Sequence, residues 1–175
     1  MTMLKIKTYT VALLVFIGVL LFSVMQTVVA QVSPPNRSLK ISDPRAGQAN
    51  VRYTIGFGVS NPGYVLGSFT LLFCDNSPLI GQPCTAPTGL DVSSAVLTSQ
   101  TGVTGFSIAP GATANSLVFT RTAAFVSTTY ITIEISGITN PSAVGTYFGR
   151  IQTYSSEDAT GVSVNEGGVT FSINV

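Results

Sequence analysis

The stretch VRYTIGFGV at residues 51–59 decides the fold class of this chain. Apolar residues occupy every second position in it, namely Val51, Tyr53, Ile55, Phe57 and Val59. Side chains of a strand point alternately to opposite faces, so this period of two predicts a β-strand with one buried face. The turn-forming sequence Asn61-Pro62-Gly63 then ends the run. We therefore expect an inner strand here, packed against a second layer.

Similar short runs, separated by clusters of Gly, Pro, Asn and Asp, fill the rest of the chain. We expect further strands at Leu39–Ile41, Leu66–Phe73, Val92–Leu97, Val103–Ile108, Ser116–Arg121, Tyr130–Ser136, Thr146–Ser155 and Val162–Val175. No stretch keeps an apolar i, i+3, i+4 spacing over three helical turns. About eight or nine short strands predict an all-β fold, and their uneven lengths favour a single antiparallel Ig-like β-sandwich over a barrel. Gly167-Gly168 predicts a bulge or a hairpin in the last run.

The first thirty residues have the order of an export signal. Lys5 and Lys7 precede the apolar run Val11–Met25, and Val28-Val29-Ala30 comes just before Gln31. This order predicts a secretory signal peptide at residues 1–30 that is cleaved before Gln31. The alternative is an uncleaved membrane anchor, because residues 11–30 are long enough to span a bilayer as a helix.

Both alternatives export the remainder, so we expect the protein to be extracellular or at the cell surface. Residues 31–37 contain Pro34-Pro35 and are expected to form an extended leader. Residues 38–175 are then the β-sandwich domain, and no linker divides them. The membrane is a partner only through residues 11–30, if they are not removed.

The composition excludes several functional classes. The chain has 8 Lys+Arg, 7 Asp+Glu and no His, and losing Lys5 and Lys7 with residues 1–30 leaves a net charge of −1. Nucleic acid is not an expected partner, because no basic surplus can neutralise phosphates. A serine triad lacks its histidine base, and no phosphate loop or nucleophile elbow is present. We therefore expect a protein that is not an enzyme and binds no metal or cofactor.

Cys74 and Cys84 are expected to form a disulfide. Pro78, Gly81 and Pro83 between them turn the chain back on itself. In an oxidising compartment, two cysteines of one small domain usually pair, and closing this loop would add about 2.5–3 kcal/mol of stability. A redox pair or metal site is the alternative, although the spacing is not C-x-x-C and two sulfurs cannot complete a zinc site alone.

One row of side chains is a candidate binding surface. A period of two places Phe148, Arg150, Gln152 and Tyr154 on the same face of their strand. If exposed, these residue types stack on sugars or anchor a protein partner. The alternative is structural, with Phe148 half-covered by a loop and Arg150 packing its stem over it.

Three segments resemble known exported proteins. SLKISDPRAGQANVRYTIGF at 38–57 and LGSFTLLFC at 66–74 resemble the opening strands of exported bacterial Ig-like or fibronectin-like β-sandwich surface proteins. ISGITNPSAVGTYFGRIQTYSS at 135–156 is similar to a segment of small exported proteins from bacteria with reduced genomes. The resemblance implies the fold and export, and it supplies no catalytic residues.

These observations lead to three hypotheses about function. The first is a non-enzymatic secreted or cell-surface β-sandwich protein that acts in adhesion or surface assembly. The second is a fibre or coat subunit that self-assembles by strand addition. The third is a carbohydrate-binding module that uses the row around Arg150. The partner is accordingly a protein or glycan ligand at a surface, or another copy of the chain.

Overall fold

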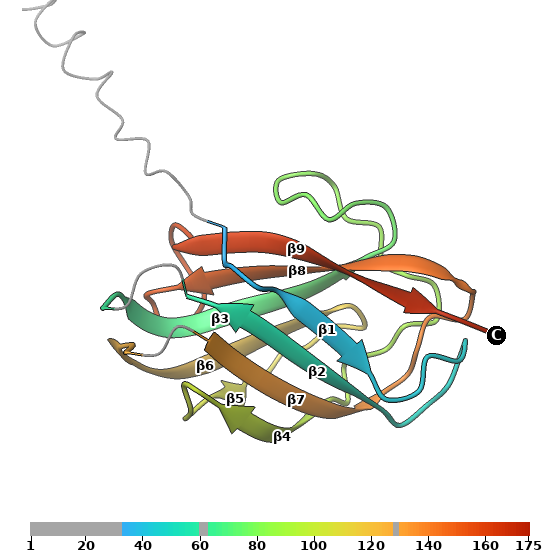
Figure 1. The fold of residues 1–175 in the computed structure, drawn as a ribbon, viewed down its shortest axis with the longest axis horizontal. Helices are drawn as coiled ribbons and strands as arrows, with labels where there is room; N and C mark the ends of the chain where they lie inside the picture. Colours follow the sequence, from blue (N-terminus) through green and yellow to red (C-terminus); the bar gives the residue numbers. More distant parts are fainter. Residues whose placement is uncertain (1–32, 60–62, 128–129) are drawn as a thin grey trace, which may run out of the picture. The chain divides into compact units, whose positions relative to one another are not determined.

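The computed structural model describes residues 33–59, 63–127 and 130–175 of the 175-residue chain. These residues contain nine β-strands and no helix, and the strands form two antiparallel sheets (Figure 1). The predicted all-β sandwich is confirmed. The predicted signal peptide or anchor at residues 1–30 lies outside the described residues. Within them, no helix has the length and hydropathy needed to cross a membrane.

The two sheets have four and five strands, in the orders β1-β2-β7-β4 and β5-β6-β3-β8-β9. The strands are β1 (Ser38–Ile41), β2 (Val51–Gly58), β3 (Val65–Cys74), β4 (Val96–Thr101), β5 (Ser107–Ile108), β6 (Ser116–Phe125), β7 (Tyr130–Ile138), β8 (Gly145–Tyr154) and β9 (Asn165–Ile173). The edge strands are therefore β1 and β4 in one sheet, and β5 and β9 in the other.

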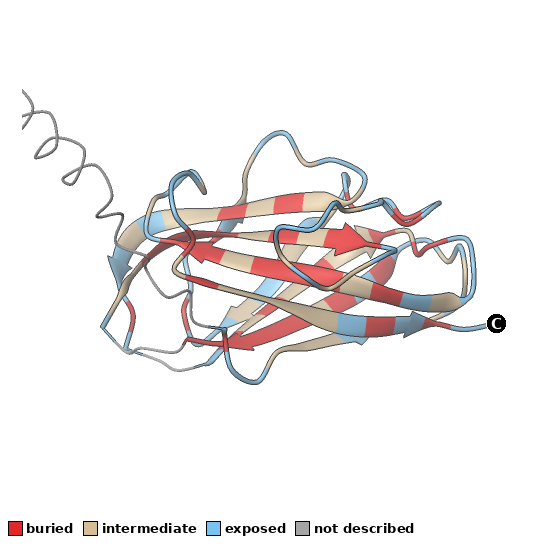
Figure 2. Cartoon of the chain, turned by 90° about the horizontal axis from the view of Figure 1, so that it is seen from above, coloured by how far each residue is buried: buried red, intermediate tan, exposed pale blue. Residues whose placement is uncertain are grey.

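The core lies between the sheets, and β2 contributes to it as its alternation predicts. Tyr53, Ile55 and Phe57 are fully buried, and buried positions alternate with more exposed ones along the strands in Figure 2. Aromatic rings meet across the two layers: the centroids of Phe57 and Phe69 on β3 are 5.2 Å apart. Such tilted or edge-to-face aromatic pairs add to the free energy gained by burying their surface.

The prediction is wrong in detail for the two weakest runs. We expect strands at 92–97 and 103–108, but β4 begins at Val96 and β5 has only two residues. Val92 is instead buried in the preceding loop, where its N–H donates to the carbonyl of Ala114. Gly102 ends β4 with a φ of 84°, and a Cβ there would lie 2.1 Å from the Tyr130 carbonyl oxygen. Only a glycine can make this close approach in that conformation.

Candidate functional site: the two sides of the sandwich

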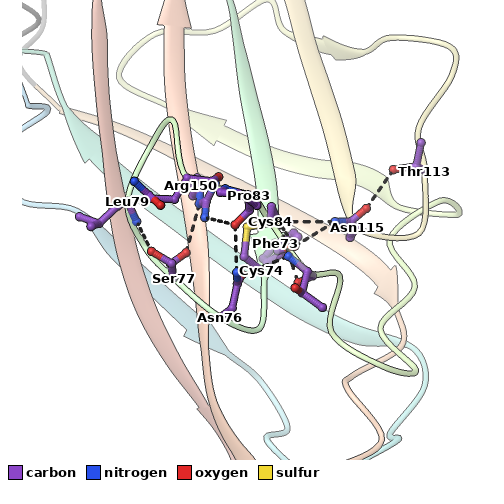
Figure 3. The surroundings of a disulfide bond; sticks show 12 residues. Phe73, Cys74, Asn76, Ser77, Leu79, Pro83, Cys84, Thr113, Asn115 and Arg150 are labelled. Atoms are coloured by element: carbon purple, nitrogen blue, oxygen red, sulfur yellow. Dashed lines mark hydrogen bonds between the residues drawn. A yellow bond between two sulfur atoms is a disulfide. The ribbon is translucent and has the colours of Figure 1, made fainter.

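The disulfide predicted from the sequence is confirmed. Cys74, the last residue of β3, is bonded to Cys84, and their Cα atoms are 5.2 Å apart (Figure 3). The N–H of Asp75 donates to the carbonyl of Thr85 over 2.8 Å, so the chain returns beside the end of β3. Residues 75–83, which we call the disulfide loop, are thereby held against the five-stranded sheet.

Arg150 on β8 holds the disulfide loop from the side of the sheet (Figure 3). Its side chain donates to three main-chain carbonyls of the loop, over 3.1 Å from Nε to Ser77, 2.7 Å from Nη1 to Gln82 and 3.3 Å from Nη2 to Pro83. Arg150 is only 4% exposed. Because a buried cation is costly unless its donors are satisfied, these carbonyls replace the water that the guanidinium loses. The residue therefore clamps the loop.

The predicted binding row is not a continuous exposed surface. Phe148, Arg150, Gln152 and Tyr154 share the outer face of β8 as expected, but Arg150 and Tyr154 are buried. The binding interpretation requires exposure, and Arg150 lacks it because the disulfide loop covers it. Phe148 and Gln152 are half-buried, and Gln152 Nε2 donates to Glu166 over 3.2 Å. A role of this row in binding sugars or a protein stays a prediction from the sequence.

Two glycines of β9 let two other segments pack closely on that edge strand. A Cβ at Gly167 would lie 2.7 Å from Nη1 of Arg37, and one at Gly168 would lie 2.5 Å from the carbonyl oxygen of Pro78. Arg37 Nε also donates to the Gly168 carbonyl over 2.7 Å. The pairing of β8 with β9 continues through these glycines without a register shift. The predicted bulge or hairpin is therefore wrong, and the glycines serve close packing instead.

The far end of β9 is joined to the connection between β1 and β2. The Asn174 N–H donates to the Pro44 carbonyl over 2.8 Å, and the Ala46 N–H donates to the Asn174 carbonyl over 3.1 Å. These bonds tie the two sheets together at this end. We call the side formed by β1, β9 and the segments that cover them the closed side.

A buried polar pair supports the same connection from inside. Tyr53 Oη donates to Oδ1 of the fully buried Asn140 over 2.8 Å. Asn140 Nδ2 donates in turn to the carbonyls of Asp43 and Arg45, each over 2.8 Å. Burial raises the pKa of the Tyr53 phenol, which stays a neutral donor. An Asn directly before Pro141 is typical of turns, so the sequence does not reveal this buried role of Asn140.

The opposite side of the sandwich, formed by β4 and β5, is open. Among the described residues no strand pairs with the outer side of β4, so alternate N–H and C=O groups of this strand face away from β7. An open groove of about 650 Å³ runs beside it, lined by Ala95–Gln100 and Phe106–Ile108. Val96 at the start of β4 is 59% exposed.

The core is nevertheless closed behind this open edge. Gln100 bridges β4 to the segment before β5, since Nε2 donates to the Phe106 carbonyl over 3.1 Å and Oε1 accepts the Phe106 N–H over 2.9 Å. Phe106 is 4% exposed, and its ring centroid lies 5.1 Å from that of Phe69. The core behind the open side is thus well packed, and only the backbone edge of β4 lacks a partner strand among the described residues.

The two sides also differ in charge. Between Asp91 and Arg121 the sequence contains no charged residue, and this stretch includes all of β4 and β5. The closed side carries Arg37, Lys40 and the Asp43–Arg45 ion pair, whose Oδ2 and Nη2 atoms are 2.6 Å apart. Edge strands are usually protected by charges, by proline or by a covering segment. On β4, within the described residues, we find no charge, no proline and no covering strand, although its pairing with β7 has a register shift between Leu97 and Ser99.

The carboxylates are dispersed over the sandwich, and several accept hydrogen bonds from neighbouring groups. Asp91 accepts the N–H of Ser93 over 2.8 Å, and the Ser93 hydroxyl and N–H together lower the pKa of Asp91. Glu157 accepts the Ala123 N–H on β6 over 2.8 Å. Within the described part of the chain, no three His, Cys, Asp or Glu residues gather as metal ligands.

Neither a family model nor a curated protein matches the chain. Solved structures with a similar fold include BslA, a bacterial hydrophobin, with a TM-score of 0.45 and 9% identity over 79% of this chain and 94% of that one. The human F-spondin reeler domain has a TM-score of 0.42 and 11% identity over 82% and 93%. The collagen-binding domain of a Staphylococcus aureus adhesin has a TM-score of 0.35 and 15% identity, over 73% of this chain and 89% of that one. At TM-scores below 0.5 these likenesses carry no argument about this chain.

Proposed function

We propose that this chain is an exported, non-enzymatic β-sandwich protein that acts outside the cell or at its surface, in surface assembly or adhesion. The open, uncharged edge of β4 carries the proposal. A free strand edge offers a row of backbone donors and acceptors to another chain, and recognition by strand addition uses such a row. An exposed edge of this kind promotes aggregation unless a partner covers it.

Two further observations support export. The Cys74–Cys84 disulfide is of a kind that forms and persists in oxidising compartments outside the cytosol. The order of charged, apolar and small residues over positions 1–30 is that of a secretory signal. Each observation points to the same compartment from a different part of the chain.

The assignment as a binding protein follows from the chemistry of the groove. No ionisable side chain is among the residues that line the groove beside β4. General acid–base catalysis needs a titratable group within hydrogen-bond reach of the substrate. Backbone groups, hydroxyls and apolar side chains suit a partner strand better than they suit a reaction.

Export is tested by expressing the full chain with a tag after Val175, which is fully exposed. We expect the tagged protein in the medium, or digested when a protease is added to intact cells, and we expect mass spectrometry to find Gln31 at its N-terminus. A variant lacking residues 1–30 is the control and should stay inside the cell. Retention of the full chain inside the cell, with both cysteine thiols reactive, would contradict the proposal.

A further inference from the structure

We propose that the open edge of β4 is a self-association surface, on which β4 of a second copy pairs antiparallel about a two-fold axis. The inference deepens the proposed function and rests on it. It names the partner of the open edge, which is another copy of this chain, and it sets the size of the assembly, which is a dimer.

The geometry of an edge strand suits such a pair. Two antiparallel β4 strands would satisfy each other's outward N–H and C=O groups on either side of the irregularity between Leu97 and Ser99. The two four-stranded sheets would then form one continuous sheet across the interface. A two-fold interface is self-complementary, because the same patch serves on both copies.

The absence of charge favours a copy of the same strand as the partner. Near a two-fold axis each residue meets its own counterpart or a close neighbour, so any charge on β4 would face a like charge. The sequence VLTSQT of β4 contains no charge, and neither do its flanks from Val92 to Thr120. In a pair centred on Thr98 and Ser99, Val96 would face the partner's Thr101, and β-branched pairs of this kind stabilise sheets.

The closed side limits the assembly to two copies. Head-to-tail strand addition would need a second free edge, since each copy must offer one edge and accept another. On β9, the Arg37 side chain occupies the Gly168 carbonyl in the middle of the strand, and just beyond its end Asn174 is bonded to Pro44 and Ala46. β1 has only four residues and carries the exposed Lys40, two features that protect an edge. A dimer, and not a fibre, is therefore expected.

The test is the mass of the exported protein in solution, measured by sedimentation at several protein concentrations. We expect a monomer–dimer equilibrium without larger species. Val96→Lys/Thr101→Lys should weaken dimerisation at least tenfold, because like charges would face each other across the axis. Val96→Glu/Thr101→Glu should do the same. Both positions pair with uncharged residues on β7, namely Ser136 and Thr132.

Mixing the lysine and glutamate variants should restore the dimer, now with one copy of each. This rescue separates pairing of β4 with β4 from any general effect of charge or misfolding, and unchanged unfolding midpoints provide a second check. Thr170→Lys on the exposed part of β9 is the matched control and should leave the dissociation constant unchanged.

Three outcomes would overturn the inference: a monomer at every concentration, polymers larger than a dimer, or no restoration on mixing. A chain that is exported but monomeric would contradict this inference and leave the proposed export intact. A chain that dimerises but stays inside the cell would contradict the proposed function alone.

Discussion

The two sides of the sandwich differ in how they treat the backbone groups of their edge strands. On the closed side, the leader, the disulfide loop and the β1–β2 connection pack against β9 through bonds such as Arg37 Nε to the Gly168 carbonyl. On the open side, β4 keeps its backbone edge exposed and carries no charge. Both sides close the core with a buried aromatic side chain, Phe171 on β9 and Phe106 before β5.

The difference shows that the covering segments of the chain lie on the closed side. The closed side contains extra chain, a disulfide, a buried arginine and two glycines that allow close packing. Nothing comparable is present on β4 within the described residues, although the edge is as long as many natural strands. We infer that the closed side is completed within one chain and that the open side is completed by association.

The largest expected effects test whether the two sides are equally well packed inside. Phe171→Ala and Phe106→Ala should each lower the free energy of unfolding by about 3–5 kcal/mol, because each removes a buried ring and leaves a cavity. Denaturant unfolding with comparable slopes measures both losses. A much smaller loss of unfolding free energy at Phe106 would mean that the open side is loosely packed. This result would contradict the claim that the core is equally well packed on both sides.

The next effect belongs to the closed side alone. Cys74→Ser/Cys84→Ser should lower the free energy of unfolding by about 2.5–3 kcal/mol, because the unfolded chain regains the entropy of an open loop. Ser93→Ala/Ser94→Ala, in an exposed turn ahead of β4, is a control and should stay within about 1 kcal/mol of the parent. No loss in the cysteine variant would show that the disulfide does not stabilise the closed side.

A smaller loss is expected for the clamp on the disulfide loop. Arg150→Met should cost about 2 kcal/mol, because three charge-assisted hydrogen bonds to the loop are lost. The same substitution should cost less when Cys74 and Cys84 are already serine, since the loop is then free to leave the sheet. Arg52→Met is the matched control, because Arg52 is exposed and lies 3.7 Å from Glu134. Additive losses would show that Arg150 does not act through the loop.

The smallest effect concerns acid stability on the closed side. Hydrogen bonds from the Arg45 side chain and N–H lower the pKa of Asp43 below its usual 3.8. A lowered folded-state pKa contributes stability above the unfolded value, and this contribution is lost as pH falls through 3.8 and below. Asp43→Asn should therefore flatten part of the loss of stability below about pH 4. Arg45→Gln should have a similar effect, and unlike slopes in the two variants would contradict the pairing.

Strong alternation made most of the fold predictable. In β2, β3 and β7 large apolar residues alternate with polar or small ones, so the period locates the strand and its buried face. The Ser/Thr-rich segments around β4 and β5 have no such contrast, and their bounds were displaced. Local turn geometry at Gly102, which depends on the approach of Tyr130, decides where β4 ends.

The candidate surfaces were less predictable because they depend on how distant segments pack. The period placed Arg150 on the correct face of β8, but it could not show that residues 75–83 fold over that face. The adjacent glycines of β9 are a usable signal for close packing, whereas the pattern alone predicts a bulge or a hairpin there. The charge-free stretch from Val92 to Thr120 is visible in the sequence, yet it gains meaning only once the topology places it at an edge.

The most direct test of the account is amide hydrogen exchange of the purified protein at low and high protein concentration. We predict that outward-facing amides of β4 exchange rapidly in dilute solution and slowly in concentrated solution, because a second copy then covers them. The amides of Ala46 and Asn174, bonded within the chain, should be equally protected at both concentrations. Exchange in β4 that does not change with concentration would contradict the claim that one side is completed within the chain and the other by a second copy.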